Sequence, residues 1–209
     1  LAPGAPVDGA IAKATALVAG DVNGDRHPDL VVVQDRAGCR LWMGNTLGRF
    51  APAAPAALPD TARRGTAAQL FDFDGDGDLD LLLGYGLDAT ESARDRLLIN
   101  DGSGSFLDTS ATILPNVEWP TRCFAIGDLD GDGLLDVILT SGPRKNQIFR
   151  QTSRWKFEEV DWDESSADVW SSGAAVLDID NDGDLDIYVC NYDVANRLYI
   201  NETKPGGKI

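Results

Sequence analysis

Acidic side chains at alternating positions recur in four short segments of the chain, at a spacing that could hold a metal ion. The segments begin at residues 21, 72, 128 and 178, which lie 51, 56 and 50 residues apart. They read DVNGDRHPD, DFDGDGDLD, DLDGDGLLD and DIDNDGDLD. Oxygen ligands at positions 1, 3, 5, 7 and 9 of such a loop can wrap one hard divalent cation.

Calcium is the cation that we expect, because it takes oxygen ligands in a flexible shell. The predicted ligands are the side chains at loop positions 1, 3, 5 and 9 and the backbone carbonyl at position 7. They are Asp21, Asn23, Asp25, His27 and Asp29; Asp72, Asp74, Asp76, Asp78 and Asp80; Asp128, Asp130, Asp132, Leu134 and Asp136; and Asp178, Asp180, Asp182, Asp184 and Asp186. Without an ion, carboxylates this close together would repel one another strongly. The sequence therefore predicts up to four structural Ca²⁺ ions.

The first loop is expected to be the weakest site. It has Asn23 in place of one carboxylate and Arg26 where the other loops have a turn glycine. A non-glycine residue is uncommon at positive φ, and an arginine adds positive charge near the ion. His27, the one histidine of the chain, is expected to offer its backbone carbonyl and to point its imidazole to solvent.

The loops do not match an EF-hand, which needs a bidentate Glu at position 12 between two helices. Position 12 is Val32, Leu83, Leu139 and Val189, within short apolar runs rich in β-branched residues. Such runs indicate buried strands, and another apolar run precedes each loop. Each loop is therefore expected to connect the first two strands of a repeat as a long hairpin.

Two further strands are expected in each repeat. RLWMG, RLLIN, QIFRQ and RLYIN give the third, and Phe50, Phe106 and Phe157 open the fourth. Four short strands per 50 residues are typical of a propeller blade. We predict an all-β β-propeller of four four-stranded blades in a single domain, residues 1–209. The repeats are approximately 13–62, 63–118, 119–169 and 170–209, with residues 1–12 as candidates to complete the last blade.

The chain resembles the FG-GAP/VCBS-type repeat family. The resembling residues are D-x-D-x-D-G-x-x-D with apolar flanks, followed by N-R-L-Y-x-N and G-x-G-x-F; the closest stretch runs from Trp170 to Asn201. The resemblance implies a calcium-containing β-propeller, usually extracellular or periplasmic, of the kind found in integrin α-chain heads, fungal lectins and large bacterial surface proteins.

Four repeats depart from the seven blades common in that family. Three arrangements are open: a closed four-bladed ring, which we favour slightly; a part of a longer propeller; or closure by pairing with another copy. An open array would expose sheet edges and blade faces and so promote self-association.

Composition limits the partners. The chain has 18 basic and 34 acidic residues, a formal charge of −16, and half of the acids lie in the four loops. Four Ca²⁺ ions would bring the charge to about −8. Nucleic acid and anionic membranes attract basic surfaces, so neither is an expected partner. No run approaches the roughly 18 apolar residues of a membrane span. Because loop sites of this kind suit millimolar calcium, we expect an extracellular or periplasmic location.

An enzyme is not expected, because the chain has no nucleophile elbow, metalloprotease, phosphate-loop or dinucleotide motif. The first hypothesis is a calcium-stabilised scaffold for protein–protein contact, as in cell adhesion. The second is a calcium-dependent lectin. Trp119, Trp162 and Trp170 are its candidate sugar platforms, although Trp119 and Trp170 are more simply explained as packing between blades.

Three remaining features have structural or weak interpretations. The insertion Asp88 to Asp95 is a third candidate binding surface, expected to add no strand. Cys123 and Cys190 fall on expected inner strands and are interpreted as free thiols. Asn201 opens a single glycosylation sequon, which is a weak match.

Overall fold

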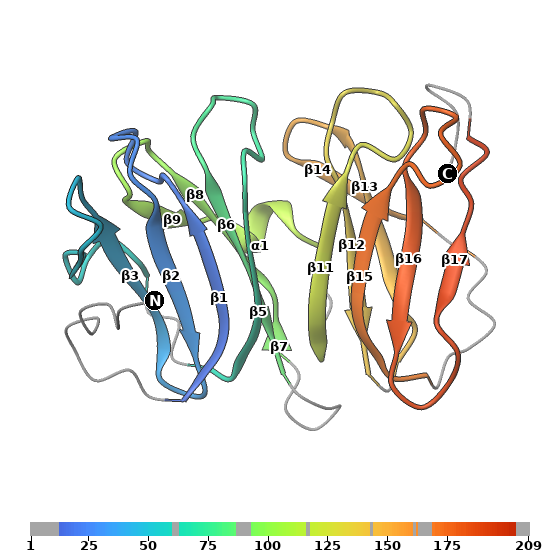
Figure 1. The fold of residues 1–209 in the computed structure, drawn as a ribbon, viewed down its shortest axis with the longest axis horizontal. Coiled ribbons are helices and arrows are strands. Elements are labelled where there is room, and N and C mark those ends of the chain that lie inside the picture. Colours follow the sequence, from blue (N-terminus) through green and yellow to red (C-terminus); the bar gives the residue numbers. More distant parts are fainter. Residues whose placement is uncertain are drawn as a thin grey trace. The chain divides into compact units, whose positions relative to one another are not determined.

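The computed structural model describes residues 13–59, 63–86, 93–115, 118–142, 144–160, 162 and 169–203. Its strands form four blade sheets and one small accessory sheet (Figure 1). The all-β propeller prediction is therefore confirmed, and each predicted repeat contains one blade sheet. The one described helix, α1 (Ser110–Ile113), has four residues. In the part of the chain that the structure describes, no helix has the length and apolar character needed to cross a bilayer.

Three of the blades are complete antiparallel sheets of four strands. Blade 1 is β1 (Ala14–Gly20), β2 (Asp29–Gln34), β3 (Gly38–Gly44) and β4 (Phe50–Pro52). Blade 2 is β5 (Gly65–Phe71), β6 (Asp80–Tyr85), β8 (Arg96–Asn100) and β9 (Phe106–Asp108). Blade 3 is β11 (Thr121–Gly127), β12 (Asp136–Ser141), β13 (Gln147–Ser153) and β14 (Lys156–Val160).

Blade 4 has three described strands: β15 (Ser171–Leu177), β16 (Asp186–Asn191) and β17 (Arg197–Tyr199). The expected site of its fourth strand lies beyond Thr203, and the candidate completing segment is residues 1–12. Both fall outside the described residues, so the completion of this blade stays a prediction.

The insertion in the second repeat differs from our expectation. Its end forms a two-residue strand, β7 (Ala93–Arg94), which pairs antiparallel with β10 (Glu118–Trp119). The prediction that the insertion adds no strand was therefore wrong. A two-residue strand has too little hydrophobic alternation to be recognised in sequence. The remainder of the insertion, residues 88–92, lies outside the described residues.

The chain forms two compact units, each built around two blades. The first comprises residues 1–83 and 96–110, and the second comprises residues 84–95 and 111–209. The expectation of a single domain stays a prediction.

The second strand of each blade is its most buried element. Val31, Val32 and Val33 in β2 and Leu81, Leu82 and Leu83 in β6 are all buried. A strand buried on both faces reads as a continuous apolar run, which explains the VVV and LLL segments.

Within each unit, one blade packs directly on the next. A Cβ placed on Gly20 in blade 1 would lie 2.6 Å from Leu79 of blade 2, and one on Gly127 in blade 3 would lie 2.8 Å from Leu185 of blade 4. The glycine that precedes the loop therefore allows the leucine at loop position 8 of the following blade to approach closely. This packing helps to position the acidic loops of blades 2 and 4, which contain Leu79 and Leu185.

Candidate metal centres in the hairpin loops

All four acidic loops connect the first and second strands of their blades, as predicted. The residue before the loop pairs with the position-9 aspartate that opens the second strand, as in Gly20 with Asp29 and Leu177 with Asp186. The loop therefore replaces the tight turn of a hairpin, and the strand ladder fixes both of its ends.

Each loop turns through two residues in the left-handed region. Position 4 is Gly24, Gly75, Gly131 or Asn181, with φ between 64° and 76°. Position 6 is Arg26, Gly77, Gly133 or Gly183, with φ between 68° and 101°. Glycine and asparagine tolerate this conformation, whereas arginine is strained in it. The expected strain at Arg26 is therefore present.

The position-1 aspartate organises the loop by accepting backbone N–H groups. In the second loop, the Asp72 carboxylate accepts hydrogen bonds from the N–H groups of Gly75, Asp76 and Gly77 at 2.8–3.1 Å. Equivalent bonds from positions 5 and 6 are made to Asp21, Asp128 and Asp178. A carboxylate at this position therefore shapes the turn as well as offering oxygens to a cation.

The position-9 aspartate is buried in every loop, and it joins the loop to the third strand. One oxygen accepts the N–H of loop position 2, and the other accepts the N–H of a residue at or just after the third strand. The donors are Val22 and Gly44 for Asp29, Phe73 and Asn100 for Asp80, Leu129 and Gln151 for Asp136, and Ile179 and Asn201 for Asp186, at 2.7–2.9 Å. The sequence identified these residues as ligands but not as structural acceptors, which requires knowledge of the strand register.

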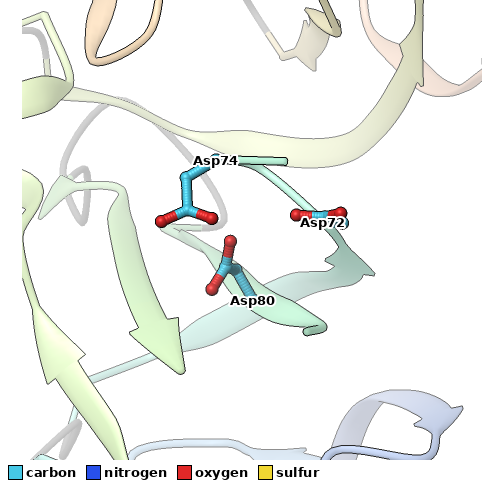
Figure 2. A group of neighbouring side chains, drawn as sticks. All are labelled: Asp72, Asp74 and Asp80. Carbon is cyan, nitrogen blue, oxygen red and sulfur yellow. The ribbon is translucent and has the colours of Figure 1, made fainter. Parts of the chain in front are cut away.

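In the second, third and fourth loops, carboxylates at positions 1, 3 and 9 converge. Figure 2 shows Asp72, Asp74 and Asp80 with their carboxylates turned toward a common space. In each of these loops the three residues offer one oxygen apiece, and these atoms lie within 4.8 Å of one another. The groups are Asp72, Asp74 and Asp80; Asp128, Asp130 and Asp136; and Asp178, Asp180 and Asp186. The donor set is entirely oxygen, which fits a hard divalent cation.

The position-5 carboxylates are predicted ligands that lie outside these convergent groups. Asp76, Asp132 and Asp182 each accept the N–H of position 7, at 2.8–3.0 Å. This bond draws positions 5 and 7 together. The predicted ligand roles of the position-5 side chains and the position-7 carbonyls stay predictions.

The first loop differs in chemistry from the others. The amide of Asn23 donates to the carboxylate of Asp25 at 3.2 Å. The ring Nδ1 of His27 also lies 3.1 Å from that carboxylate, with the side chain 31% exposed. The imidazole therefore contacts a predicted ligand as well as solvent, which the sequence analysis did not anticipate. The N–H of His27 donates to Asp25, and this bond is the main cause that lowers the pKa of the Asp25 carboxyl.

Burial and crowding both raise the pKa of the position-9 carboxyl groups of the second and third loops. Burial, with a smaller contribution from the nearby carboxylates of Asp74 and Asp76, raises the pKa of Asp80 to about 6 against two backbone hydrogen bonds that lower it. Asp136 behaves in the same way, with its pKa raised to about 6 by burial and by Asp130 and Asp132. Uncompensated negative charge at these positions is costly, so a bound cation would relieve it.

Comparison with known protein families agrees with the repeat architecture. A sequence profile described as the FG-GAP-like repeat matches residues 14–83, 87–139 and 128–189, well over half of the chain. The chain belongs to the FG-GAP repeat family. No curated protein sequence matches it.

Two solved structures align with most of this chain at low identity. The biofilm matrix protein Bap1 of V. cholerae is 16% identical over 91% of this chain, with a TM-score of 0.49. The chain spans 31% of the length of Bap1. BBS1N, from a complex with ARL6DN, is 15% identical over 95% of this chain and 81% of its own, with a TM-score of 0.32.

Asparagines at or just after the end of the third strand tie one FG-GAP blade to the blade before it. The side-chain amide of Asn100 donates to the carbonyls of Val22 in blade 1 and Leu79 in blade 2, at 2.8 and 3.1 Å. Asn201 repeats this pattern toward Leu129 in blade 3 and Leu185 in blade 4, at 2.7 and 3.1 Å. The final asparagine of the RLLIN and RLYIN motifs is visible in the sequence, but its spacing alone predicted no role for it. The side-chain nitrogen of Asn201 donates both of these hydrogen bonds within the fold, which argues against glycosylation at the sequon.

A second polar tie precedes the third strand. In blade 3, Asn146 accepts the N–H of Ser141 at 2.9 Å and donates to Ser171 Oγ of blade 4 at 2.8 Å. At the corresponding position of the second repeat stands Asp95, which accepts the N–H of Tyr85 at 3.1 Å and the hydroxyl of Thr121 at 2.7 Å. Burial raises the pKa of this carboxyl to about 7, although both hydrogen bonds lower it. An ionisable group thus occupies a site that elsewhere holds a neutral amide.

The candidate sugar platforms have different environments. Trp162 donates to the Asn146 carbonyl at 3.3 Å and lies 4.7 Å from the Tyr199 ring, against the core between blades 3 and 4. Trp170 contacts Gly142 and the Arg122 guanidinium but stays 40% exposed. The side chain of Trp119 lies outside the described residues. Trp162 therefore packs in the core. Of the two candidate tryptophans whose side chains the structure describes, Trp170 is the one that is exposed to solvent.

The cysteines form no disulfide. Cys39, Cys123 and Cys190 all lie in described segments, are free, and are partly buried. Cys123 and Cys190 are therefore free, as interpreted from the sequence, but only partly buried.

Proposed function

We propose that this chain is a non-catalytic, calcium-binding FG-GAP propeller module that acts as a scaffold for protein–protein contact. The observation that carries the proposal is the convergence of three carboxylates in each of three equivalent loops. Repetition of one ligand set at one place in the blade favours a structural role, because a catalytic site would need one loop to differ in its chemistry.

Calcium fits these loops better than other common ions. Zn²⁺ prefers nitrogen and sulfur ligands, and the second to fourth loops contain neither His nor Cys. Mg²⁺ demands near-ideal octahedral geometry and retains several waters, whereas Ca²⁺ accepts 6–8 oxygens in a flexible shell. When bound, the ion would neutralise crowded carboxylates and hold the hairpin. The chain's own contribution is to pre-position the carboxylates at positions 1 and 9 through backbone hydrogen bonds.

We place the module in an extracellular or periplasmic assembly. Extracellular modules commonly bind calcium with millimolar-range dissociation constants, and the partly exposed loops suit such affinities. The acidic surface is consistent with a protein partner rather than nucleic acid. The single histidine contacts Asp25 within the least regular loop, which gives no support to an acid–base mechanism.

Thermal unfolding with and without calcium tests the structural role. A cation that binds only the folded state stabilises it by about 2.7 kcal/mol per site at a hundredfold excess over its dissociation constant. We expect the melting temperature to rise in millimolar Ca²⁺ relative to EGTA. The double variant Asp74→Asn, Asp76→Asn should lose part of that rise, while Asp193→Asn, an exposed carboxylate outside the loops, should retain it. Equal melting temperatures in calcium and EGTA for the unsubstituted chain would refute the structural role.

A calcium-dependent lectin is the second candidate, and one observation favours it. Trp170 and Tyr192 are 40% and 77% exposed, and the Tyr192 N–H donates to the Trp170 carbonyl at 2.8 Å. Exposed aromatic faces suit the apolar face of a sugar ring. A glycan array in millimolar Ca²⁺ and in EGTA distinguishes the candidates. Calcium-dependent binding that Trp170→Ala and Tyr192→Ala both weaken would support the lectin, and a negative array with folded protein would favour the scaffold.

A further inference from the structure

The third acidic loop is in contact with a positive charge from its own blade. The guanidinium of Arg150 in β13 lies 3.3 Å from one carboxylate oxygen of Asp130. The other oxygen of Asp130 accepts the N–H of Asp132 at 3.2 Å. Asp130 is buried and belongs to the convergent group of this loop. A residue that could hold a cation is therefore already paired with an arginine.

The strand ladder explains why these two side chains meet. The Asp136 carboxylate accepts the N–H of Leu129 through one oxygen and the N–H of Gln151 through the other. Asp130 follows the first of these donors in the chain and Arg150 precedes the second, so the two bonds bring both residues close. Every position-9 aspartate makes the same pair of bonds, so each blade holds a third-strand residue near loop position 3.

Blade 3 is the blade that has a charge at this place in the repeat. The residues that correspond to Arg150 are Met43 in blade 1, Ile99 in blade 2 and Ile200 in blade 4. All three are apolar, so they offer the neighbouring loop no counter-charge. The third loop therefore differs from the second and the fourth in its electrostatics, although all three loops have the same convergent carboxylates.

Burial makes the ion pair of Arg150 matter more than the other pair on the outer strands. Glu158 faces Arg150 across the β13–β14 ladder and lies 2.6 Å from the ammonium of Lys156. The side chains of that pair are 61% and 50% exposed, so water screens it. The side chain of Asp130 is only 3% exposed. A carboxylate buried to this degree would be left as an uncompensated charge if its partner were removed.

We propose that Arg150 is a built-in counter-ion of the third loop and competes with calcium for Asp130. This inference rests on the proposed calcium-binding function of the loops. Without calcium, Arg150 neutralises part of the carboxylate cluster and stabilises the loop. With calcium, the guanidinium repels the ion and occupies one oxygen of a ligand. The third site is therefore weaker than the second and the fourth, and the loops form a graded series.

Coulomb repulsion sets the size of the effect on binding. Even at the dielectric constant of water, a unit charge roughly 6 Å from a divalent ion weakens its binding about tenfold. Arg150→Ile introduces the residue type found in blades 2 and 4 and should tighten calcium binding at the third site by about that factor. Titration calorimetry of the full chain measures this change. Arg49→Ile, at an exposed arginine in the β3–β4 loop, removes the same charge and should leave the affinities unchanged.

Thermal unfolding in EGTA tests the counter-ion role without calcium. Arg150→Ile should lower the melting temperature by roughly 5 °C, because Asp130 is left buried without its partner. Arg150→Lys keeps the charge and should recover part of this loss. In a chain that carries Asp130→Asn, the further change Arg150→Ile should have little effect, because the charge pair is already absent.

The possible outcomes separate this inference from the proposed function. Calcium binding with the same affinities in Arg150→Ile and in the unsubstituted chain would overturn the competition and leave the proposed function standing. An equal loss of melting temperature with and without Asp130→Asn would show that Arg150 acts by packing alone, which overturns the counter-ion role. Absence of calcium binding from both chains would refute the proposed function and the competition together.

Discussion

Replacing Asp95 with asparagine should stabilise the protein at neutral and alkaline pH. The pKa of this carboxyl rises from 3.8 to about 7 because the group is buried. This rise in pKa corresponds to at most about 4 kcal/mol, since each tenfold change in proton affinity is worth about 1.4 kcal/mol. The residue is partly exposed, so solvent lowers this figure, and we expect a gain of about 1–3 kcal/mol.

The geometry of Asn146 indicates that asparagine can replace Asp95 without loss of hydrogen bonds. An asparagine at position 95 would accept the N–H of Tyr85 through its carbonyl and donate through its amide to the Thr121 hydroxyl. Asn146 makes the same two bonds, with Ser141 and Ser171. The substitution would therefore remove the charge and preserve the tie between blades.

The gain should depend on pH in a defined direction. Because the pKa of Asp95 is higher in the folded state, that state binds more protons than the unfolded state between about pH 4 and pH 7. Wild-type stability is therefore lost as the pH rises through this window, and the benefit of asparagine appears over the same window. Below about pH 4 both states hold a protonated Asp95, and the benefit should vanish.

Urea unfolding in EGTA at about pH 8 and about pH 4.5 measures the difference in unfolding free energy between the Asp95→Asn variant and the unsubstituted chain. Asp193→Asn, at an exposed carboxylate, is the control and should change little at either pH. A loss of stability in Asp95→Asn at the higher pH, or a gain of equal size at both pH values, would refute the assignment of a buried, raised-pKa carboxyl.

Three further predictions concern the loops and ties. Asp136→Ala should lower the free energy of unfolding by about 2–5 kcal/mol in EGTA, because the N–H groups of Leu129 and Gln151 lose their acceptor in a buried site. Urea unfolding measures this loss, and a loss seen only in calcium would contradict the prediction. Arg26→Gly should gain about 1 kcal/mol by relieving left-handed strain and should tighten calcium binding at the first loop; calorimetry showing unchanged or weaker binding would oppose this. Asn201→Ala should cost about 1–2 kcal/mol by releasing two carbonyls, and a thermal melt identical to that of the unsubstituted chain would contradict the tie.

The sequence predicted the blades well because the repeat itself is the signal. Four loops in register, each between apolar runs, located the first two strands of every blade and all three convergent carboxylate groups. The position-9 aspartates were assigned as ligands from spacing alone. Their second role, as acceptors of backbone N–H groups, depends on which N–H of the third strand faces them. Spacing along one hairpin contains no such information.

Features that join different repeats were the least predictable. The bond from Asn201 to Leu129 spans 72 residues, so only the packed structure brings its partners together. Trp162 was considered as a sugar platform because its loop looked exposed, yet it packs against Tyr199. The strand pairing of Ala93 with Trp119 was missed for a different reason, because two-residue strands show no periodicity in the sequence.

Counting bound calcium by equilibrium dialysis against millimolar Ca²⁺ tests the central claim most directly. The account predicts at least three ions per chain, in the second, third and fourth loops, with the first loop filling last. It also predicts one ion fewer in the double variant Asp74→Asn, Asp76→Asn and no change in Asp193→Asn. Less than one ion per folded chain, or a count unaffected by the double variant, would contradict calcium binding by these loops.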